Sequence, residues 1–349
     1  MSSTVSIALD AMGGDGAPAM VVNGADLARA RFPQARFLFF GDAARIQPLL
    51  DRLPQLAEVS SVHHADQVVT AADKPSAALR AGRGSSMRLA IDAVRDGRAA
   101  GIVSAGNTGA LMAMAKFVLK TMPGIDRPAI ASFFPTMRGE SVMLDLGANV
   151  VCDADNLVQF AVMGEVFART VLGVLRPTIG LLNVGSEDLK GHEAVREAAA
   201  ILRSTSLPGV FHGFVEGDDI AKGTVDVVVT DGFTGNVAVK AIEGTAKLYA
   251  EFLRHAFKSS LLSRLGYLLA RPALNTLRVR TDPRRYNGAI FLGLNGIAVK
   301  SHGGTDAFGF SNAIGVTIDM IRHGATDKIK EDFARLAARP PSGAQAASV

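Results

Sequence analysis

Short apolar segments alternate with amphipathic segments of helical length along almost the whole chain. An apolar segment followed by a helical one is typical of a sheet that is covered by helices on both faces. We therefore expect an α/β fold with a doubly wound, mostly parallel sheet. The predicted strands span residues 5–9, 36–40, 101–104, 129–133, 142–144, 178–182, 210–214, 225–230 and 289–292.

One pair of strands is predicted to be antiparallel. Residues 130–134 and 141–144 are separated only by a short polar segment, as in a hairpin. The other predicted strands are joined by helical segments, so most neighbours should be parallel. In such folds ligands bind beyond the carboxyl ends of the strands, and we look for the functional residues in the turns there.

Length and composition limit the class of protein. The 349 residues are 48% hydrophobic and 20% charged, which excludes a disordered, collagen-like or coiled-coil chain. We expect one α/β catalytic domain at 1–335, an amphipathic helical extension at 246–285 and a disordered tail at 336–349. A single cysteine, no apolar run long enough for a bilayer and no recognisable secretion signal lead us to expect the cytoplasm.

Positive charge is concentrated in one segment. The chain has a net charge of +4, too little to indicate a nucleic-acid partner, but residues 251–285 contain eight basic and two acidic residues and are therefore +6. This leucine-rich segment suits contact with an anionic membrane surface or an acidic protein. A helical hairpin buried in a dimer interface is the alternative. The candidate contact residues are Arg254, Lys258, Leu261, Leu262, Leu265, Leu268 and Arg271.

Glycine-rich turns follow four of the predicted strands. Glycine lets the backbone approach a ligand, and free amides at a helix start attract phosphate or carboxylate. Residues 103–109 and 229–235 share one pattern of valine, hydroxyl, glycine and threonine-glycine, so these two turns could flank one crevice, or small residues could have converged there. The candidate substrate-binding residues are Asp10, Gly13, Gly14, Asn107, Thr108, Gly109, Asn183, Ser186, Thr234 and Gly235.

Three further side chains in glycine-rich segments are of types that take part in catalysis, and we take them as the candidate catalytic residues. The ammonium group of Lys190 can hold an anionic oxygen. The amide of Asn236 can donate a hydrogen bond to a developing oxyanion, and His302 can carry a proton near neutral pH. The structural alternatives are an exposed lysine, a helix-capping asparagine and a buried imidazole.

Other kinds of site lack their motifs. The sequence has neither a Gly-x-Ser-x-Gly nucleophile motif nor a Gly-x-Gly-x-x-Gly dinucleotide fingerprint, and residues 192–196 depart from the His-Glu-x-x-His zinc motif at the last position. His63 and His64 have no identifiable third metal ligand, and a lone Cys152 is more typical of a small buried residue than of a nucleophile. We expect no metal and no other cofactor, and direct displacement rather than a covalent intermediate.

Six ordered blocks together resemble the bacterial phosphate acyltransferase family, PlsX-type. They are residues 7–18, 104–110, 144–149, 183–191, 230–236 and 302–303. The resemblance extends over residues 4–335, and the ordered set is specific where each block alone is not. Gly16 departs from the pattern, because many members are expected to have histidine there, and the tail falls outside it.

The resemblance implies a homodimeric enzyme with a fold similar to phosphotransacetylases and isopropylmalate dehydrogenases. It implies that fatty acyl-ACP, the thioester of acyl carrier protein, and inorganic phosphate react to form acyl phosphate and free acyl carrier protein, in phospholipid synthesis. Lys190 and Asn236 match positions of the family's active site. The implied partners also include the inner face of the cell membrane, where the protein would bind peripherally, and a membrane glycerol-phosphate acyltransferase; nucleic acid is not among them.

Two alternative functions remain open at this point. A CoA-dependent phosphotransacetylase would use similar phosphate-binding turns but would need neither a long acyl tunnel nor a basic docking face. A non-catalytic, membrane-associated scaffold of lipid synthesis would keep the amphipathic segment and have no turnover. In the favoured function phosphate attacks the thioester directly, which requires a bound anion and donors for a tetrahedral oxyanion.

Overall fold

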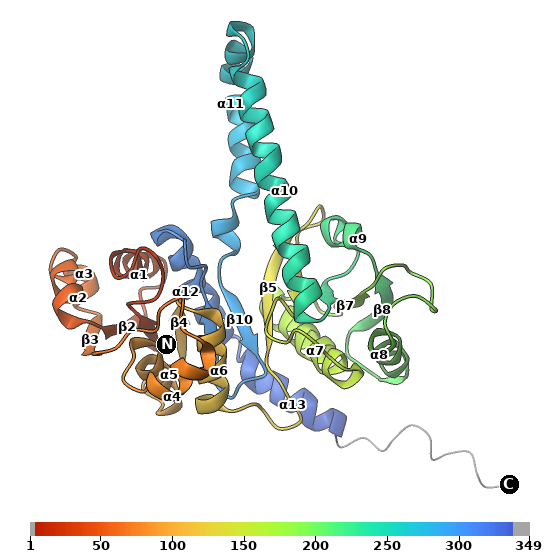
Figure 1. The fold of residues 1–349 in the computed structure, drawn as a ribbon, viewed down its shortest axis with the longest axis horizontal. Coiled ribbons are helices and arrows are strands. Elements are labelled where there is room, and N and C mark those ends of the chain that lie inside the picture. The colour runs from red at the N-terminus through yellow and green to blue at the C-terminus, as the bar shows by residue number, and fades with distance from the viewer. Residues whose placement is uncertain (1–3, 338–349) are drawn as a thin grey trace.

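The computed structural model describes residues 4–337, and eleven strands of this part of the chain form one sheet (Figure 1). The strands are β1 (Val5–Asp10), β2 (Ala35–Gly41), β3 (Ser60–His64), β4 (Gly101–Ser104), β5 (Ala129–Pro135), β6 (Glu140–Leu144), β7 (Thr178–Leu182), β8 (Val210–Val215), β9 (Val227–Val229), β10 (Ala289–Leu292) and β11 (Ile297–Lys300). Their order in the sheet is β3-β2-β1-β4-β11-β10-β5-β6-β9-β7-β8.

Most neighbouring strands are parallel, as the sequence predicts. Seven pairings are parallel, and the three antiparallel ones are β11–β10, β10–β5 and β5–β6. The expected antiparallel pair is confirmed, since Ala131 lies opposite Leu144 and Phe134 lies opposite Ser141. The doubly wound, mostly parallel α/β fold is therefore confirmed, with an antiparallel centre.

Helices cover both faces of the sheet, because successive side chains of a strand point to opposite sides. Ile7 and Leu9 of β1 belong to one hydrophobic cluster with side chains of α1 and α12, whereas Ala8 between them belongs to another with α5 and α6. The helices are α1 (Ala19–Arg31), α2 (Ala43–Leu50), α3 (Pro54–Ala57), α4 (Pro75–Ala81), α5 (Ser86–Arg95), α6 (Thr108–Leu119), α7 (Ala154–Phe167), α8 (Glu193–Ser204), α9 (Gly217–Lys222), α10 (Gly232–Lys258), α11 (Leu261–Arg280), α12 (Ala307–Arg322) and α13 (Ala325–Ala337).

The sequence analysis does not predict two of the strands. β3 reads Ser-Ser-Val-His-His and pairs with β2 at the edge of the sheet, where its side chains are half-buried or exposed and need not be apolar. β11 is four residues long and follows β10 after a short turn, so its apolar run is too brief to stand out from its surroundings. The missed β11 matters below, because its carboxyl end carries a site residue.

The α10–α11 hairpin projects from the body of the molecule (Figure 1). α11 has no buried side chain, and the rings of Phe257 and Tyr267 pack edge to face where the two helices meet, with centroids 5.4 Å apart. The predicted extension at 246–285 covers the distal part of α10 and all of α11. At the other boundary α13 continues to Ala337, and the rest of the predicted tail, 338–349, lies outside the described residues.

Candidate active site

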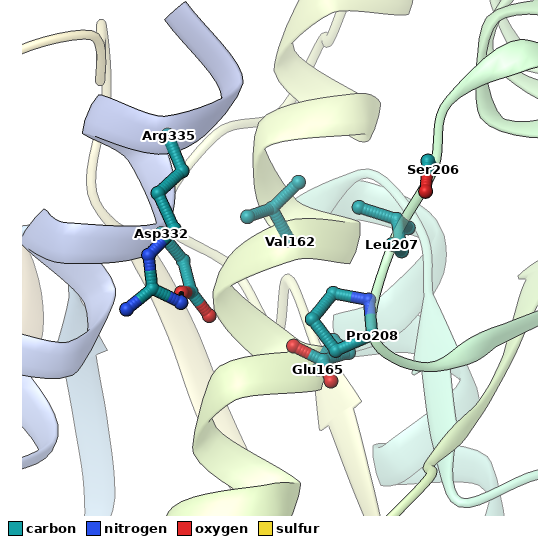
Figure 2. A pocket seen from close by; sticks show the side chains of 7 residues that line it. All are labelled: Val162, Glu165, Ser206, Leu207, Pro208, Asp332 and Arg335. Atoms are coloured by element: carbon teal, nitrogen blue, oxygen red, sulfur yellow. Dashed lines mark hydrogen bonds and ion pairs between the residues drawn. The ribbon is translucent and has the colours of Figure 1, made fainter. Parts of the chain in front are cut away.

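A pocket of about 230 Å³ between α7, the α8–β8 loop and α13 does not have the features of an active site (Figure 2). Its charged side chains bind one another: Arg169, at its edge, donates to Glu165 and Asp332, and Arg335 donates to Asp332 at 3.0 Å. None of the candidate residues lines it. The pocket lining is Val162, Glu165, Ser206, Leu207, Pro208, Asp332 and Arg335.

One group of polar side chains lies at the carboxyl ends of β1, β4 and β11. Asp10 is 1% exposed, and its carboxylate oxygens accept hydrogen bonds from Ser86 Oγ and Ser104 Oγ, each at 2.6 Å. Burial raises the pKa of Asp10, and the two hydroxyl donors oppose that rise. Gly13 lies directly on this carboxylate, since a Cβ there would be 2.6 Å from Asp10 Oδ2. We call Asp10, Gly13, Ser86, Ser104 and Lys300 the β1 group.

The sequence analysis singled out neither Lys300 nor the two serines of the β1 group. Lys300 Nζ donates hydrogen bonds to the carbonyl oxygens of Ala105, at 3.3 Å, and Ser301. Burial lowers the pKa of Lys300 to about 8, and attraction to Asp10 and Asp15 partly opposes that shift. The signal in the sequence was a lysine that ends an apolar run immediately before Ser-His-Gly-Gly.

Asn107, Thr108 and Gly109 form the start of α6, next to the β1 group. Asn107 caps the helix: its Oδ1 accepts a hydrogen bond from Ala110 N at 3.0 Å, and its Nδ2 donates to carbonyl oxygens within residues 70–73. The side chain of Asn107 therefore holds the turn in place. Thr108 is exposed and Gly109 half-buried, so their backbone remains accessible to a ligand.

His302 and Gly14 lie in turns that contact each other. Asp15 N, directly after Gly14, donates a hydrogen bond to Gly303 O at 3.0 Å. The side chain of His302 is exposed, and its Nδ1 accepts a hydrogen bond from Gly304 N at 3.2 Å. The buried-imidazole alternative is therefore wrong, and His302 is accessible from solvent beside the first glycine turn.

A second group lies at the carboxyl ends of β6, β9 and β7, around a buried carboxylate. Asp145 has an exposed fraction of 0%, and burial raises its pKa while the hydrogen bonds it accepts oppose that rise. Its donors are the backbone N–H groups of Ile130, Gly147, Ala148 and Asn149 and the side-chain amide of Asn149. We call Asp145, Asn149, Asn183, Lys190 and Asn236 the β9 group.

Asn236 is held against the turn that Asp145 organises. Its Nδ2 donates a hydrogen bond to Leu146 O at 3.1 Å, which directs the amide toward this turn. A side-chain amide has two N–H groups, so one donor remains beyond the bond to Leu146. Gly235 allows the close approach, because a Cβ there would be 2.0 Å from Asp145 O.

Asp231 is the residue that caps α10. It accepts hydrogen bonds from Thr234 N at 2.8 Å and Thr234 Oγ1 at 2.9 Å. The capping alternative for Asn236 is therefore wrong, since Asn236 lies inside the helix. Thr234, by contrast, uses its hydroxyl in the cap.

The loop after β7 carries the other predicted residues of the β9 group. Asn183 closes this loop, because its Nδ2 donates to Lys190 O at 3.1 Å and its Oδ1 accepts from Val184 N at 2.9 Å. Ser186 and Lys190 are exposed, and within residues 4–337 Lys190 forms no ion pair within 4.0 Å. β7 pairs with β9 in parallel, so this loop neighbours the start of α10.

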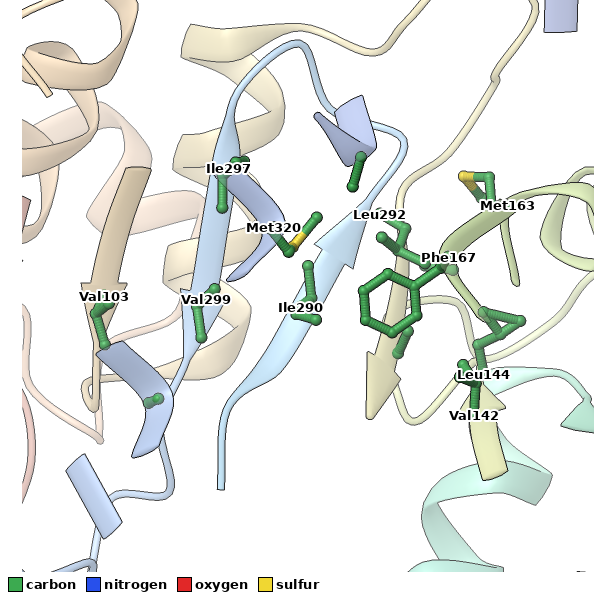
Figure 3. Packing of buried hydrophobic residues seen from close by; sticks show 14 of the residues in the cluster. Val103, Val142, Leu144, Met163, Phe167, Ile290, Leu292, Ile297, Val299 and Met320 are labelled. Carbon is green, nitrogen blue, oxygen red and sulfur yellow. The ribbon is translucent and has the colours of Figure 1, made fainter. Parts of the chain in front are cut away.

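The β1 and β9 groups lie at opposite ends of the sheet's strands. β10 is antiparallel to both of its neighbours and β5 is antiparallel to β6, so β4 and β9 run in opposite directions. Figure 3 shows the middle of the sheet, where Val299 of β11, Ile290 of β10 and, beyond β5, Leu144 of β6 lie in one hydrophobic cluster. The turns 103–109 and 229–235 therefore do not share one edge.

The turn after β6 nevertheless packs against hydrophobic clusters in both halves of the molecule, the half with the β1 group and the half with the β9 group. Leu146 packs against a cluster built with Met143, Val225 and Val228 and also against the cluster to which α5 and α6 contribute. Ala148 packs against the second of these clusters too. The β9 group is therefore connected through buried apolar contacts to the half of the molecule that holds the β1 group.

Comparisons with known proteins identify the family. A family model described as "Fatty acid synthesis protein" matches residues 5–328. The chain is 68% identical to a phosphate acyltransferase of Rhodospirillum centenum over 100% of both chains. The chain belongs to the phosphate acyltransferase family. It is 63% identical to another such protein, from Paramagnetospirillum magneticum, over 100% of this chain and 99% of that one, so this chain is an enzyme of lipid synthesis that transfers acyl groups.

Solved structures with a similar fold include two phosphotransacetylases. The protein from Streptococcus pyogenes matches with a TM-score of 0.62 at 17% identity, covering 91% of this chain and 94% of that one. EutD phosphotransacetylase from Staphylococcus aureus matches with a TM-score of 0.59 at 16% identity, covering 93% and 95%. The fold similarity to phosphotransacetylases that the sequence resemblance implies is confirmed, and at these identities the likeness concerns the fold alone.

Proposed function

We propose that this enzyme transfers a fatty acyl group from acyl carrier protein to inorganic phosphate. The observation that carries the proposal is the 68% identity, over the full length of both chains, to a protein named phosphate acyltransferase. The β9 group suits the reaction, because Asn236 offers a second amide N–H and Lys190 an exposed ammonium group, and the reaction needs donors for the oxyanion and a cation for the attacking anion. We also propose that no metal or other cofactor takes part.

In the proposed mechanism a phosphate oxygen attacks the carbonyl carbon of the thioester. The new C–O bond forms as the π electrons of the carbonyl move to its oxygen. The resulting tetrahedral oxyanion accepts a hydrogen bond from the free N–H of Asn236 and is stabilised by the positive charge of Lys190. The intermediate then releases the sulfur of acyl carrier protein with the electrons of the C–S bond. His302 is exposed and could deliver the proton that this thiolate takes up.

The other predicted residues of the site are proposed to bind phosphate and thioester. Their backbone amides line glycine-rich turns, and small residues there let a tetrahedral anion approach. Asn107, Asn183 and Thr234 act by fixing those turns, since their side chains bond to the protein. The proposed substrate-binding set is Asp10, Gly13, Gly14, Asn107, Thr108, Gly109, Asn183, Ser186, Thr234 and Gly235.

Comparing two acyl donors in an assay for acyl phosphate tests this proposal. Purified protein is incubated with phosphate and either palmitoyl-ACP or acetyl-CoA, and acyl phosphate is trapped as the hydroxamate with hydroxylamine. We expect hydroxamate from palmitoyl-ACP that depends on both protein and phosphate, with omission of phosphate as the control for direct aminolysis. Product from acetyl-CoA alone would indicate a phosphotransacetylase, and no product from either donor would refute acyl transfer to phosphate.

We propose that the tip of the α10–α11 hairpin contacts an anionic membrane or acyl carrier protein. Leu261, Leu262 and Leu268 are 82%, 83% and 67% exposed, which is costly for leucine in water without a partner. Basic side chains flank them, as at a peripheral membrane surface. Among residues 4–337 no helix is long and apolar enough to cross a membrane. The proposed surface consists of Arg254, Lys258, Leu261, Leu262, Leu265, Leu268 and Arg271.

Vesicle sedimentation tests the membrane contact. We expect Leu268→Glu to weaken co-sedimentation with vesicles that contain anionic lipid, because it places a negative charge on the apolar tip. Leu175→Glu is the matched control, since Leu175 is 86% exposed but lies between α7 and β7. Equal binding by wild type and Leu268→Glu, or no binding by either, would contradict a membrane contact at this tip.

The remaining proposals concern assembly and location. We propose a homodimer that is cytoplasmic, bound to the inner face of the cell membrane and functionally coupled to a membrane glycerol-phosphate acyltransferase that consumes acyl phosphate. Exposed apolar side chains along both hairpin helices support a partner on this surface. Sedimentation equilibrium of wild type and Leu268→Glu distinguishes a membrane-contacting tip from one buried in a dimer interface. If the wild type is a dimer and the variant a monomer, the tip lies in the dimer interface.

A further inference from the structure

Lys300 lies at the carboxyl end of β11, beside the carboxyl ends of two further strands, β4 and β1. In the sheet β11 is next to β4 and β4 is next to β1. Lys300 lies opposite Ser104 in register, and Ser104 Oγ donates to the carboxylate of Asp10. The ends of β1, β4 and β11 therefore bring one ammonium group, one hydroxyl group and one buried carboxylate together beside Gly13 of the first glycine turn.

The ammonium group of Lys300 connects two of the turns. Its acceptors are Ala105 O, in the turn between β4 and α6, and Ser301 O, in the turn between β11 and α12. Both turns also contact the first glycine turn: a Cβ on Gly13 would be 2.7 Å from Gly106 N, and Asp15 N bonds to Gly303 O. A lysine with these contacts fixes the relative position of all three turns.

The positive charge of Lys300 is not consumed by a direct ion pair. Within residues 4–337 no carboxylate lies within 4.0 Å of its Nζ, although Asp10 and Asp15 are near enough to attract it. An ammonium group has three N–H donors, and the protein carbonyls accept two of them. One N–H donor and the positive charge of Lys300 therefore remain without a direct partner in the described part of the chain, beside the turn in which the exposed His302 lies.

We propose that Lys300 is a phosphate-binding residue, which donates its third N–H to the anion and positions the turns around it. This inference rests on the proposed function, and it gives the glycine turns of the β1 group their own cation, separate from Lys190 in the β9 group. The rival role is a purely structural one, in which Lys300 only balances the buried Asp10. The two roles differ in what happens when inorganic phosphate is added.

Phosphate-dependent thermal stability distinguishes these roles without any acyl donor. We expect inorganic phosphate to raise the Tm of wild type and of Lys300→Arg, and to have little effect on Lys300→Met, because binding only the folded state stabilises it. Lys328→Met, an exposed lysine on α13, is the matched control. Absence of a phosphate effect on wild type, or an equal effect on Lys300→Met, would overturn the inference.

Steady-state kinetics give a second readout. A charge-assisted hydrogen bond contributes about 1.5–3 kcal/mol, so Lys300→Met should raise KM for phosphate about ten- to a hundredfold and leave KM for the acyl donor nearly unchanged. A parallel loss of kcat with unchanged KM for phosphate would indicate the structural role. If phosphate stabilises wild type in this way but no acyl phosphate forms, the proposed function fails and the inference stands.

The pH dependence keeps the inference testable even if Lys300→Met does not fold. Burial lowers the pKa of Lys300 to about 8, with Asp10 and Asp15 the charged groups that oppose this. The phosphate-dependent gain in Tm should therefore decline above pH 8 in wild type and persist in Lys300→Arg. A gain that stays constant through this range in wild type would contradict the inference.

The stability of the free protein provides an independent check of that pKa. Because the folded pKa is below the ordinary value of 10.5, the unfolded chain binds more protons between about pH 8 and 10.5. Wild-type stability relative to Lys300→Met should therefore rise with pH across this interval.

Discussion

Lys190→Ala is expected to lower kcat/KM for acyl-phosphate formation by a hundredfold or more while the protein stays folded. The side chain of Lys190 is exposed and makes no ion pair within residues 4–337, so its ammonium group is available to an anionic oxygen of the reacting groups. Losing one such donor costs about 3 to 4 kcal/mol of transition-state stabilisation. The measurement is the hydroxamate assay with palmitoyl-ACP and phosphate.

The controls separate a chemical role of Lys190 from a structural one. Among the described residues the ammonium group of Lys190 forms no hydrogen bond or ion pair, whereas its backbone closes the loop through Asn183. Lys190→Ala should therefore change the free energy of unfolding by less than about 0.5 kcal/mol, as should Lys328→Ala on α13. Lys328→Ala should also keep full turnover. A Lys190→Ala enzyme with most of the wild-type rate would refute the assignment.

The fold was predicted well from the sequence because the same pattern, an apolar strand followed by an amphipathic helix, is repeated along the chain. Buried parallel strands must be apolar on both faces, and segments such as the one that became β4 therefore stand out against the helices around them. β3 escapes this test because it is a polar edge strand, and β11 because it is four residues long. The antiparallel centre was visible only at β5 and β6, so the reversal between the two halves was not predicted.

The site was predicted less completely, for a physical reason. Glycine-rich turns after strands indicate where ligands can approach, and the turns that carry Gly13 and Asn236 do surround buried polar groups. Which side chains face the ligand depends on tertiary hydrogen bonds. Asn107 is used in a helix cap, whereas Asp145 is buried and Lys300 half-buried by segments distant in the sequence. A single sequence contains no local signal for such burial.

Asp145→Asn should destabilise the protein strongly, by about 3–5 kcal/mol. All the hydrogen bonds to the Asp145 side chain come from N–H donors: Oδ1 accepts from Ile130, Gly147 and Ala148, and Oδ2 accepts from the backbone and side chain of Asn149. Whichever way the new amide is oriented, its NH2 group faces at least two of these donors in a site that water does not reach. Leaving buried donors unpaired has a cost of this order.

Urea unfolding measures the effect, and Asp155→Asn is the matched control. Asp155 is exposed in the first turn of α7, where its loss should change the free energy of unfolding by less than about 1 kcal/mol. Similar unfolding midpoints for the two variants would show that the hydrogen-bond network around Asp145 contributes little to stability.

Asp145→Asn should also slow acyl transfer at temperatures where the variant is still folded. Leu146 O holds the amide of Asn236 at 3.1 Å, and Asp145 orients the turn that carries this carbonyl. Once the turn loosens, the free N–H of Asn236 is no longer held at a fixed distance from the oxyanion. The variant should therefore have a lower kcat and a nearly unchanged KM. If Asn236→Ala is made as well, the double variant should be little slower than Asn236→Ala alone, because both changes remove the same donor. Independent, multiplying losses would instead mean that Asp145 acts on the reaction by a route other than Asn236.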